Sequence, residues 1–182
     1  MSELSVGQLS GLTVNSNVIT VPAGHKLYAP GSVVQVVSAI KTDSFTTAST
    51  TFVDVTGLSL SITPISTSSK ILIMSTIPAS AQPGVVAIQM RLMRNSTEIA
   101  IGDASGSRTR LSTMAMPQST AEIAAMGVDF LDSPSTTSAT TYKIQVRANT
   151  ANTVAVNRSV LDSDSSNLGR AVSTITLMEI AQ

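Results

Sequence analysis

The sequence predicts an all-β protein, an antiparallel β-sandwich preceded by an extended N-terminal arm. Three observations support this fold class. About nine short stretches rich in Val, Ile and Thr recur at regular spacing between turn residues, which is typical of sandwiches and barrels. Several stretches alternate apolar and polar side chains with the period of two that marks a strand with one buried face. No stretch carries a convincing helical pattern.

The N-terminal segment differs from the rest of the chain. In residues 1–31, isolated apolar residues alternate with Gly, Asn and Ser, and turn residues interrupt the pattern at 22–24 and 30–31. We interpret residues 1–31 as an arm with one short strand at 17–21. Residues 32–182 then form the sandwich knob.

The first half of the knob is predicted to contain a long strand at 32–40, a polar loop at 42–51 and an alternating strand at 58–63. Residues 70–77 are apolar at both parities, so we expect this strand to lie centrally, covered on both faces. A break is predicted at 78–84. Further strands are predicted at 52–55, 85–94, 97–101, 111–116, 140–148 and 153–156, with a hairpin turn at 95–96.

The second half of the knob contains two further predicted strands. Residues 121–131 are ambiguous, because 121–126 could begin a helix whereas 127–131 favour a strand; we interpret the whole segment as a strand. Residues 171–181 form the last predicted strand. Terminal segments are usually frayed, but an apolar, β-rich segment left unpaired would expose an adhesive edge. We therefore expect this strand to pair inside a sheet and to close the fold.

The composition predicts self-association. Hydrophobic residues make up 42% of the chain and charged residues only 12%, while Ser and Thr together exceed a quarter. Ordinary soluble domains carry about 25% charged residues, and monomers rarely expose large apolar patches. The simplest explanation is that copies of the chain bury part of their surface against one another. The alternative is a monomer solvated by its hydroxyl groups.

Charge and length exclude several partners. The chain has 11 basic and 11 acidic residues, so it lacks the basic surface that nucleic acids require. No stretch approaches the ~20 apolar residues of a membrane span. The N-terminus has neither the basic nor the apolar region of a signal peptide. Without Cys, no disulfide framework is expected. We expect a protein made in a cytoplasm that contacts neither nucleic acid nor membrane.

Residues for catalysis or cofactor binding are scarce. His25 is the only imidazole and there is no Cys, so neither a catalytic triad nor a zinc site is predicted. We expect no enzyme activity, no cofactor and no metal. The segment 162–167 places Asp162, Asp164 and Asn167 in one short loop, which suggests either a calcium site or a solvated turn. It lacks the Gly and closing Glu of an EF-hand, so we favour the turn.

Four basic residues cluster in the sequence around the predicted hairpin, namely Arg91, Arg94, Arg108 and Arg110. They suggest a contact surface for an acidic partner. The alternative, which we favour, is ordinary surface charge, because most surface ion pairs contribute little to stability.

The pattern of strands is also familiar. The chain resembles a family of virion proteins of tailed phages, common in phages of aquatic bacteria, including cyanophages. The resemblance covers roughly residues 31–181, and the arm segment 19–27 looks like the leader of such proteins. It rests on the segments 31–37 (GSVVQVV), 46–54 (TTASTTFVD), 58–72, 91–99 (RLMRNSTEI), 141–146 (TYKIQV) and 173–180 (STITLMEI).

The resemblance implies a jelly-roll-like knob, usually a homotrimer, on the outside of a virion. Two locations are compatible with it: a head decoration protein bound to the major capsid protein or another virion protein, and a short tail fibre or tail-tip knob that recognises a host surface glycan or protein. The absence of a repetitive shaft favours decoration. A carbohydrate-binding module is a further alternative, although sugar platforms favour Trp and the chain has none.

The arm is the predicted attachment site. Its apolar residues are too few to form a core, so we expect them to become ordered against a partner, with strand 17–21 added to a neighbour's sheet edge. The alternative is that 17–21 is the first strand of the knob's own sheet. The residues proposed to anchor the arm are Leu12, Val14, Val18, Ile19 and Val21.

Overall fold

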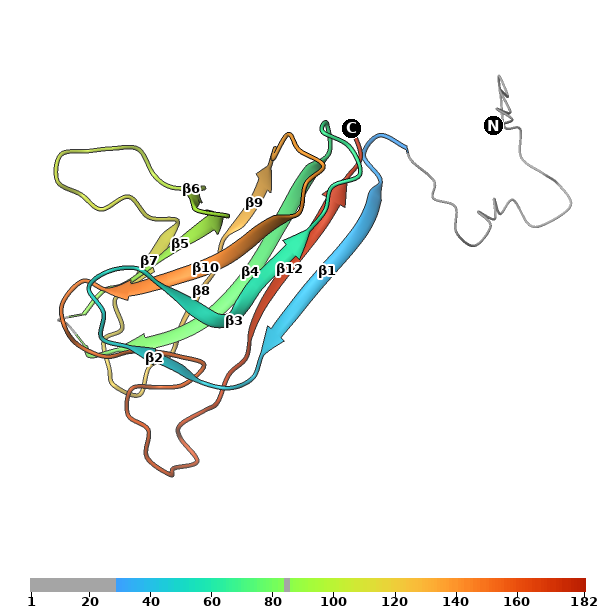
Figure 1. Cartoon of the computed structure of the whole chain (residues 1–182). Coiled ribbons are helices and arrows are strands. Elements are labelled where there is room, and N and C mark those ends of the chain that lie inside the picture. Colours follow the sequence, from blue (N-terminus) through green and yellow to red (C-terminus); the bar gives the residue numbers. More distant parts are fainter. Residues whose placement is uncertain (1–28, 84–85) are drawn as a thin grey trace, which may run out of the picture.

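A computed structural model describes residues 29–83 and 86–182, and within these ranges the chain forms twelve strands and no helix (Figure 1). In particular, this part of the chain offers no helix whose length and apolarity would let it span a bilayer. The strands are β1 (Val33–Lys41), β2 (Phe45–Thr47), β3 (Val53–Ile62), β4 (Lys70–Ala81), β5 (Ile88–Arg94), β6 (Thr97–Ile99), β7 (Thr113–Ala115), β8 (Ala124–Met126), β9 (Asp129–Asp132), β10 (Thr140–Ala148), β11 (Val154–Val156) and β12 (Ser173–Ile180).

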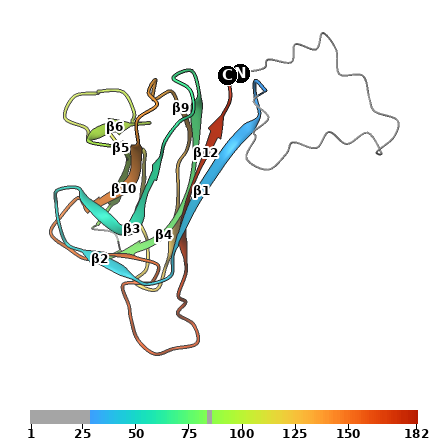
Figure 2. The same ribbon diagram turned by 45° about the vertical axis from the view of Figure 1, so that its right-hand side comes forward.

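Two antiparallel sheets pack against each other as a jelly-roll-like sandwich (Figure 2). One sheet has seven strands in the order β1-β12-β4-β11-β2, with β8 and β9 also paired to β4. The other has five strands in the order β3-β10-β5-β6, with β7 paired to β5. The all-β sandwich predicted from the sequence is thereby confirmed.

The two strands expected to be central are central. β12 pairs with β1 on one side and with β4 on the other. β4 is twelve residues long; its first half pairs with β12 and β9, and its second half with β11 and β8. The predicted hairpin is also present, because β5 pairs with β6 across Asn95, whose φ of 52° is a left-handed conformation that Asn tolerates.

The core between the sheets is aliphatic. Alternate residues of each strand point inward, and this period places apolar side chains from both sheets in one contiguous cluster. Leu58 and Ile144 from one sheet and Ile73 and Leu177 from the other are fully buried. Burial of each such side chain contributes about 1.5–3 kcal/mol to folding.

Two predicted boundaries near the start of the knob were wrong. The predicted polar loop 42–51 contains β2, a three-residue strand that exists because β11 pairs with it. The predicted strands 52–55 and 58–63 form one strand, β3. The turn residue Gly57 adopts φ +90°, and the register with β10 shifts nearby, so the glycine marks a β-bulge and not a loop.

Two further boundaries differ in the seven-stranded sheet. β4 continues through Pro78 to Ala81, beyond the predicted end at 77. Pro78 has no N–H to donate, but its carbonyl accepts a 2.8 Å hydrogen bond from the Asn157 amide. The segment 121–131 forms two strands, β8 and β9, separated at Gly127. A Cβ at Gly127 would lie 2.3 Å from the Ser75 carbonyl oxygen, so only glycine permits this approach to β4.

Candidate functional site

The most distinctive surface of the knob is the outward side of four neighbouring strands, β9, β4, β12 and β1. We call it the apolar face. Each strand alternates, so one set of side chains enters the core and the other set points away from the five-stranded sheet. In these strands the outward set is itself largely apolar. It comprises Val33, Val36, Ile40, Leu72, Met74, Leu131, Met178 and Ile180, with Ser38, Thr76, Thr174 and Thr176 between them.

Strand register arranges these side chains in rows across the sheet. Val36 pairs with Met178, Met178 with Leu72, and Leu72 with Leu131. Neighbouring strands lie about 4.8 Å apart, so this apolar row is continuous over four strands. The next row, Ser38–Thr176–Met74–Asp129, has one acidic residue at its end.

The apolar face is exposed to an unusual degree for apolar side chains. Ile40 is 63% exposed, Val36 53% and Met74 42%. By strand spacing and rise, the face measures on the order of 15 by 25 Å, which is comparable to the largest apolar patches on monomeric proteins; patches of that size are often functional. Charge appears only at its margins, at Lys70 and Asp129. The face can therefore bind an apolar surface.

β1 adds a second binding feature beside the apolar face. Among residues 29–83 and 86–182 it is the terminal strand of its sheet and pairs only with β12. Its other edge presents backbone N–H and C=O groups that another strand could pair with. In Figure 1 this edge runs along the side of the knob from which the chain leads back towards residue 29. The exposed side chains of Val36 and Ile40 lie on the same strand, so the free edge and the apolar face are contiguous.

A buried carboxylate fixes β12 from the opposite side. Glu179 is fully buried; it accepts a 2.7 Å hydrogen bond from the Ile65 amide and another from the side chain of Gln35. Burial alone would raise the pKa of this carboxyl. The hydrogen bonds from the Gln35 side chain and the Ile65 amide outweigh it, so the pKa of Glu179 lies below its ordinary value. An ionised Glu179 thus holds β1 and the turn after β3 to β12.

The residues predicted to anchor the arm, Leu12, Val14, Val18, Ile19 and Val21, lie outside the described residues, as does His25. Their roles stay predictions. A turn precedes β1, in which the Ser32 amide donates to the Ala29 carbonyl at 2.9 Å, and the predicted boundary between arm and knob at residue 31 stays a prediction. Immediately afterwards the chain enters β1.

The loop that contains 162–167 forms a cavity of about 330 Å³, lined in part by Asp162, Asp164 and Arg170. Asp162 lies 2.6 Å from an Arg170 nitrogen and 3.4 Å from an Arg158 nitrogen. Across residues 29–83 and 86–182, no three acidic or histidine side chains are grouped so as to hold a metal ion. Asp162 is thus engaged by two arginines, and the choice between the solvated turn and the calcium site stays a prediction.

The four arginines that cluster in the sequence are separated in space. Arg94 points towards the core and pairs with Asp132 at 2.9 Å. Arg91 pairs with Glu98 across the hairpin. Arg108 and Arg110 are exposed in the loop between β6 and β7. The four arginines therefore do not form a single surface.

The apolar face was not predicted as a site, although parts of its signal are visible in the sequence. Residues 70–77 are apolar at both parities, which we attributed to a position covered on both sides. The structure shows β4 paired on both edges, with its outward side chains partly exposed. Comparisons with known proteins add nothing here, since neither the protein-family models nor the curated proteins contain a match to the chain.

Proposed function

We propose that the protein is a non-enzymatic structural protein of a tailed-phage virion, a homotrimer that decorates the head. In this proposal the apolar face lines the three-fold axis, and the N-terminal arm attaches the knob to the major capsid protein or another virion protein. The trimer and the virion follow from the resemblance of the strand sequences. The apolar face is the structural observation that supports self-association.

The apolar face suits a second copy of the same chain better than a charged partner. Its charged residues, Lys70 and Asp129, lie only at its margins, so the middle of the face can meet a second copy without repulsion and without desolvating ionic groups. Apolar side chains that are still about half exposed gain on the order of 1 kcal/mol each when they become buried. Because every copy presents the same face, a closed symmetric assembly can bury all of them.

Sedimentation of the purified chain at about micromolar concentration tests the assembly. We expect one species of three chain masses. Met74→Asp and Val36→Asp each place an acidic group in the apolar face and should yield monomers. Met114→Asp is the matched control, because Met114 is 47% exposed on β7 of the other sheet; it should leave the trimer intact. A wild-type protein that sediments as a monomer would contradict the proposal.

Attachment to the particle is tested separately. A chain that lacks residues 1–29 should remain a soluble, thermally stable trimer but should fail to bind particles stripped of this protein. If that chain aggregates or unfolds, the segment belongs to the core and the anchoring role is wrong. A cryo-EM map of the particle would then locate the knob on the head or on the tail.

A further inference from the structure

Unpaired positive charge is concentrated at one place in the knob. Six ion pairs occupy most of the basic side chains in residues 29–83 and 86–182. Within those ranges, the basic residues that face no carboxylate are Lys70, Arg108, Arg110 and Arg147. Lys70 lies at the margin of the apolar face. Of the other three, Arg108 and Arg110 lie within the loop 100–112, and Arg147 is hydrogen-bonded to Thr109 of that loop.

Arg147 joins this loop to the five-stranded sheet. It lies on the outward side of β10, where its Nη2 donates a 2.8 Å hydrogen bond to the Thr109 hydroxyl. Its other nitrogens donate to the Gln89 side chain at 2.6 Å and to the Thr50 carbonyl at 3.1 Å. All three acceptors are neutral, so the guanidinium charge of Arg147 is hydrogen-bonded but not neutralised.

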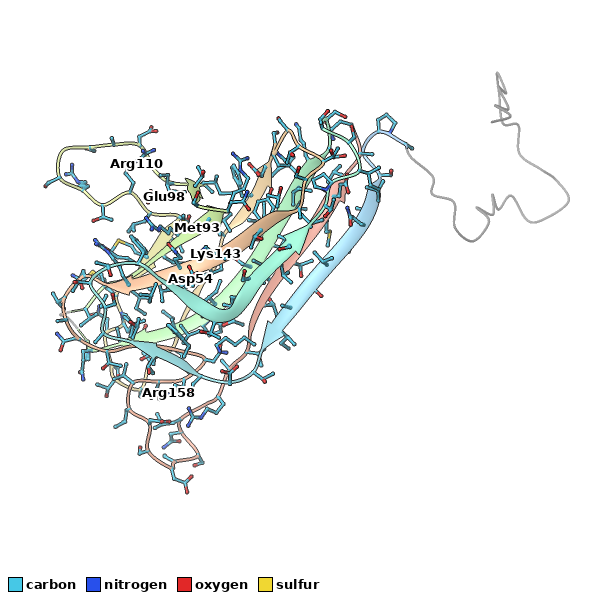
Figure 3. All side chains as sticks on the ribbon, viewed as in Figure 1. Asp54, Met93, Glu98, Arg110, Lys143 and Arg158 are labelled. Atoms are coloured by element: carbon cyan, nitrogen blue, oxygen red, sulfur yellow. The ribbon has the colours of Figure 1, made fainter. Side chains whose placement is uncertain are left out.

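Thr109 is flanked in the chain by Arg108 and Arg110, and both arginines are exposed. Arg108 donates to the Ser105 hydroxyl at 2.9 Å and Arg110 to the Gly102 carbonyl at 2.7 Å. Figure 3 shows Arg110 on the projecting loop beside the five-stranded sheet, away from the labelled pair Lys143 and Asp54. Each exposed guanidinium thus keeps several N–H donors directed to solvent, because only one nitrogen is used internally.

The loop contains a single acidic residue, Asp103, which makes no ion pair with a described residue. Three arginines against one aspartate leave a local charge of two positive units in a chain whose formal charge is zero. We propose that Arg108, Arg110 and Arg147, here named the arginine cluster, bind the carboxylate groups of an acidic polysaccharide. A guanidinium group binds a carboxylate through two parallel hydrogen bonds, and a polymer with one carboxylate per repeat can engage several arginines at once.

Other macromolecules fit the arginine cluster less well. A protein partner would need an apolar centre to its interface, whereas residues 102–110, which carry two of the three arginines, include no large apolar side chain. A single-stranded nucleic acid would need an exposed aromatic platform. The nearest ring, Phe52, is instead covered by Arg91 and Arg147, whose guanidinium carbons lie 4.1 and 5.1 Å from its centroid. Three cations are also too few for the phosphate contacts of duplex DNA.

The inference is independent of where the protein sits on a particle. The arginine cluster belongs to the five-stranded sheet, and the apolar face belongs to the opposite side of the sandwich. A trimer formed through the apolar face therefore leaves the arginine cluster accessible.

Binding of the full chain to immobilised polygalacturonate tests the proposal, with dextran as the neutral polymer. We expect binding to polygalacturonate, no binding to dextran, and a loss of affinity of about tenfold or more when Arg108→Gln and Arg110→Gln are combined. Arg170→Gln is the matched control, because Arg170 is an exposed arginine of a different loop; it should bind as the wild type does.

Three results would overturn the proposal. The double variant could bind as tightly as the wild type, dextran could bind as well as polygalacturonate, or duplex DNA could bind while polygalacturonate does not. Because Arg108 and Arg110 are exposed loop residues, the double variant should retain the wild-type unfolding temperature. That measurement separates a lost binding site from a lost fold. The two proposals can fail separately. A trimer that binds no polysaccharide would contradict only the arginine-cluster proposal, and a monomer that binds polysaccharide would contradict only the assembly proposal.

Discussion

The hydroxyl of Tyr142 on β10 donates a 2.6 Å hydrogen bond to the carboxylate of Asp132 on β9, and this bond joins the two sheets. Arg94 on β5 lies 2.9 Å from both oxygens of the same carboxylate. Tyr142 is fully buried and Asp132 is 5% exposed. Burial, together with the hydrogen bond to Asp132, raises the pKa of Tyr142 above its ordinary value near 10. The three residues form a clamp across one end of the sandwich.

Removing the hydroxyl from this clamp should weaken the fold. Tyr142→Phe leaves the ring in the core but leaves Asp132 with one hydrogen bond fewer, and we expect it to lower the free energy of unfolding by about 1–3 kcal/mol. Urea denaturation measures the change. Ser59→Ala, an exposed hydroxyl of the same sheet, should change it by less than about 0.5 kcal/mol. Equal effects of the two substitutions would refute the clamp.

The same clamp predicts a loss of stability in alkali. In the unfolded chain Tyr142 releases its proton near pH 10, whereas in the folded chain it keeps it. The unfolded state then binds fewer protons, so the free energy of unfolding falls as pH rises above about 10. Tyr142→Phe should show a shallower decline in the same range. The comparison is made by urea denaturation at successive pH values, and parallel curves for both proteins would be evidence against the raised pKa.

Glu179 predicts the opposite dependence in acid. Its pKa is lowered in the folded state, so below the ordinary pKa near 4.5 the unfolded state binds the proton first. The contribution of Glu179 is complete above that pH and is lost as pH falls through the lowered pKa. Glu179→Gln should be less stable at neutral pH and less sensitive to acid. Glu122→Gln, an exposed glutamate with one backbone hydrogen bond, is the control and should track the wild type.

Gly127 should tolerate no side chain. Gly127→Ala places a Cβ against the backbone of β4 at Ser75, and because backbone cannot yield as a side chain end can, we expect a cost of at least about 1–3 kcal/mol. Gly102→Ala is the matched control, since a Cβ there meets nothing within 4 Å. Thermal unfolding of the two variants should separate them clearly. Similar unfolding temperatures would mean that β8 and β9 can move away from β4.

Salt should distinguish the two proposed surfaces. An apolar interface is insensitive to ionic strength, so the trimer should persist from about 0.05 M to about 0.5 M NaCl. Binding of polygalacturonate to the arginine cluster should weaken strongly over the same range, because ions screen exposed charges. Sedimentation and polymer binding measured in the same buffers test this. A trimer that dissociates at high salt would indicate a charged interface.

The sequence was informative where a pattern repeats along one strand. Strict alternation located β10, and the apolar residues of 171–181 located β12 at the interior of a sheet. It failed at β2, which lies in the segment predicted to be a polar loop. This strand is only three residues long, too short for any periodicity, and it is extended because β11 pairs with it.

The two candidate surfaces could not be predicted from the sequence, for a related reason. The apolar row Val36–Met178–Leu72–Leu131 is assembled from four separate strands, so no local stretch of sequence contains it. The arginines show the opposite case, in which residues that are close in the sequence are separated in space. Arg91, Arg94, Arg108 and Arg110 are close in the sequence, yet strand parity turns Arg94 inward, while Arg147 reaches the loop from a distant strand.

The position of β12 between β1 and β4 has a consequence for biosynthesis. Both neighbours precede it in the chain, and β1 is separated from it by most of the knob. During translation, the seven-stranded sheet therefore lacks the strand between β1 and β4 until residues near 180 have emerged from the ribosome. Such distant pairings fold slowly, and a nascent chain meanwhile exposes two open strand edges that favour aggregation. We accordingly expect folding during synthesis to depend on chaperones that protect the unpaired edges of β1 and β4 from aggregation until β12 can pair with them.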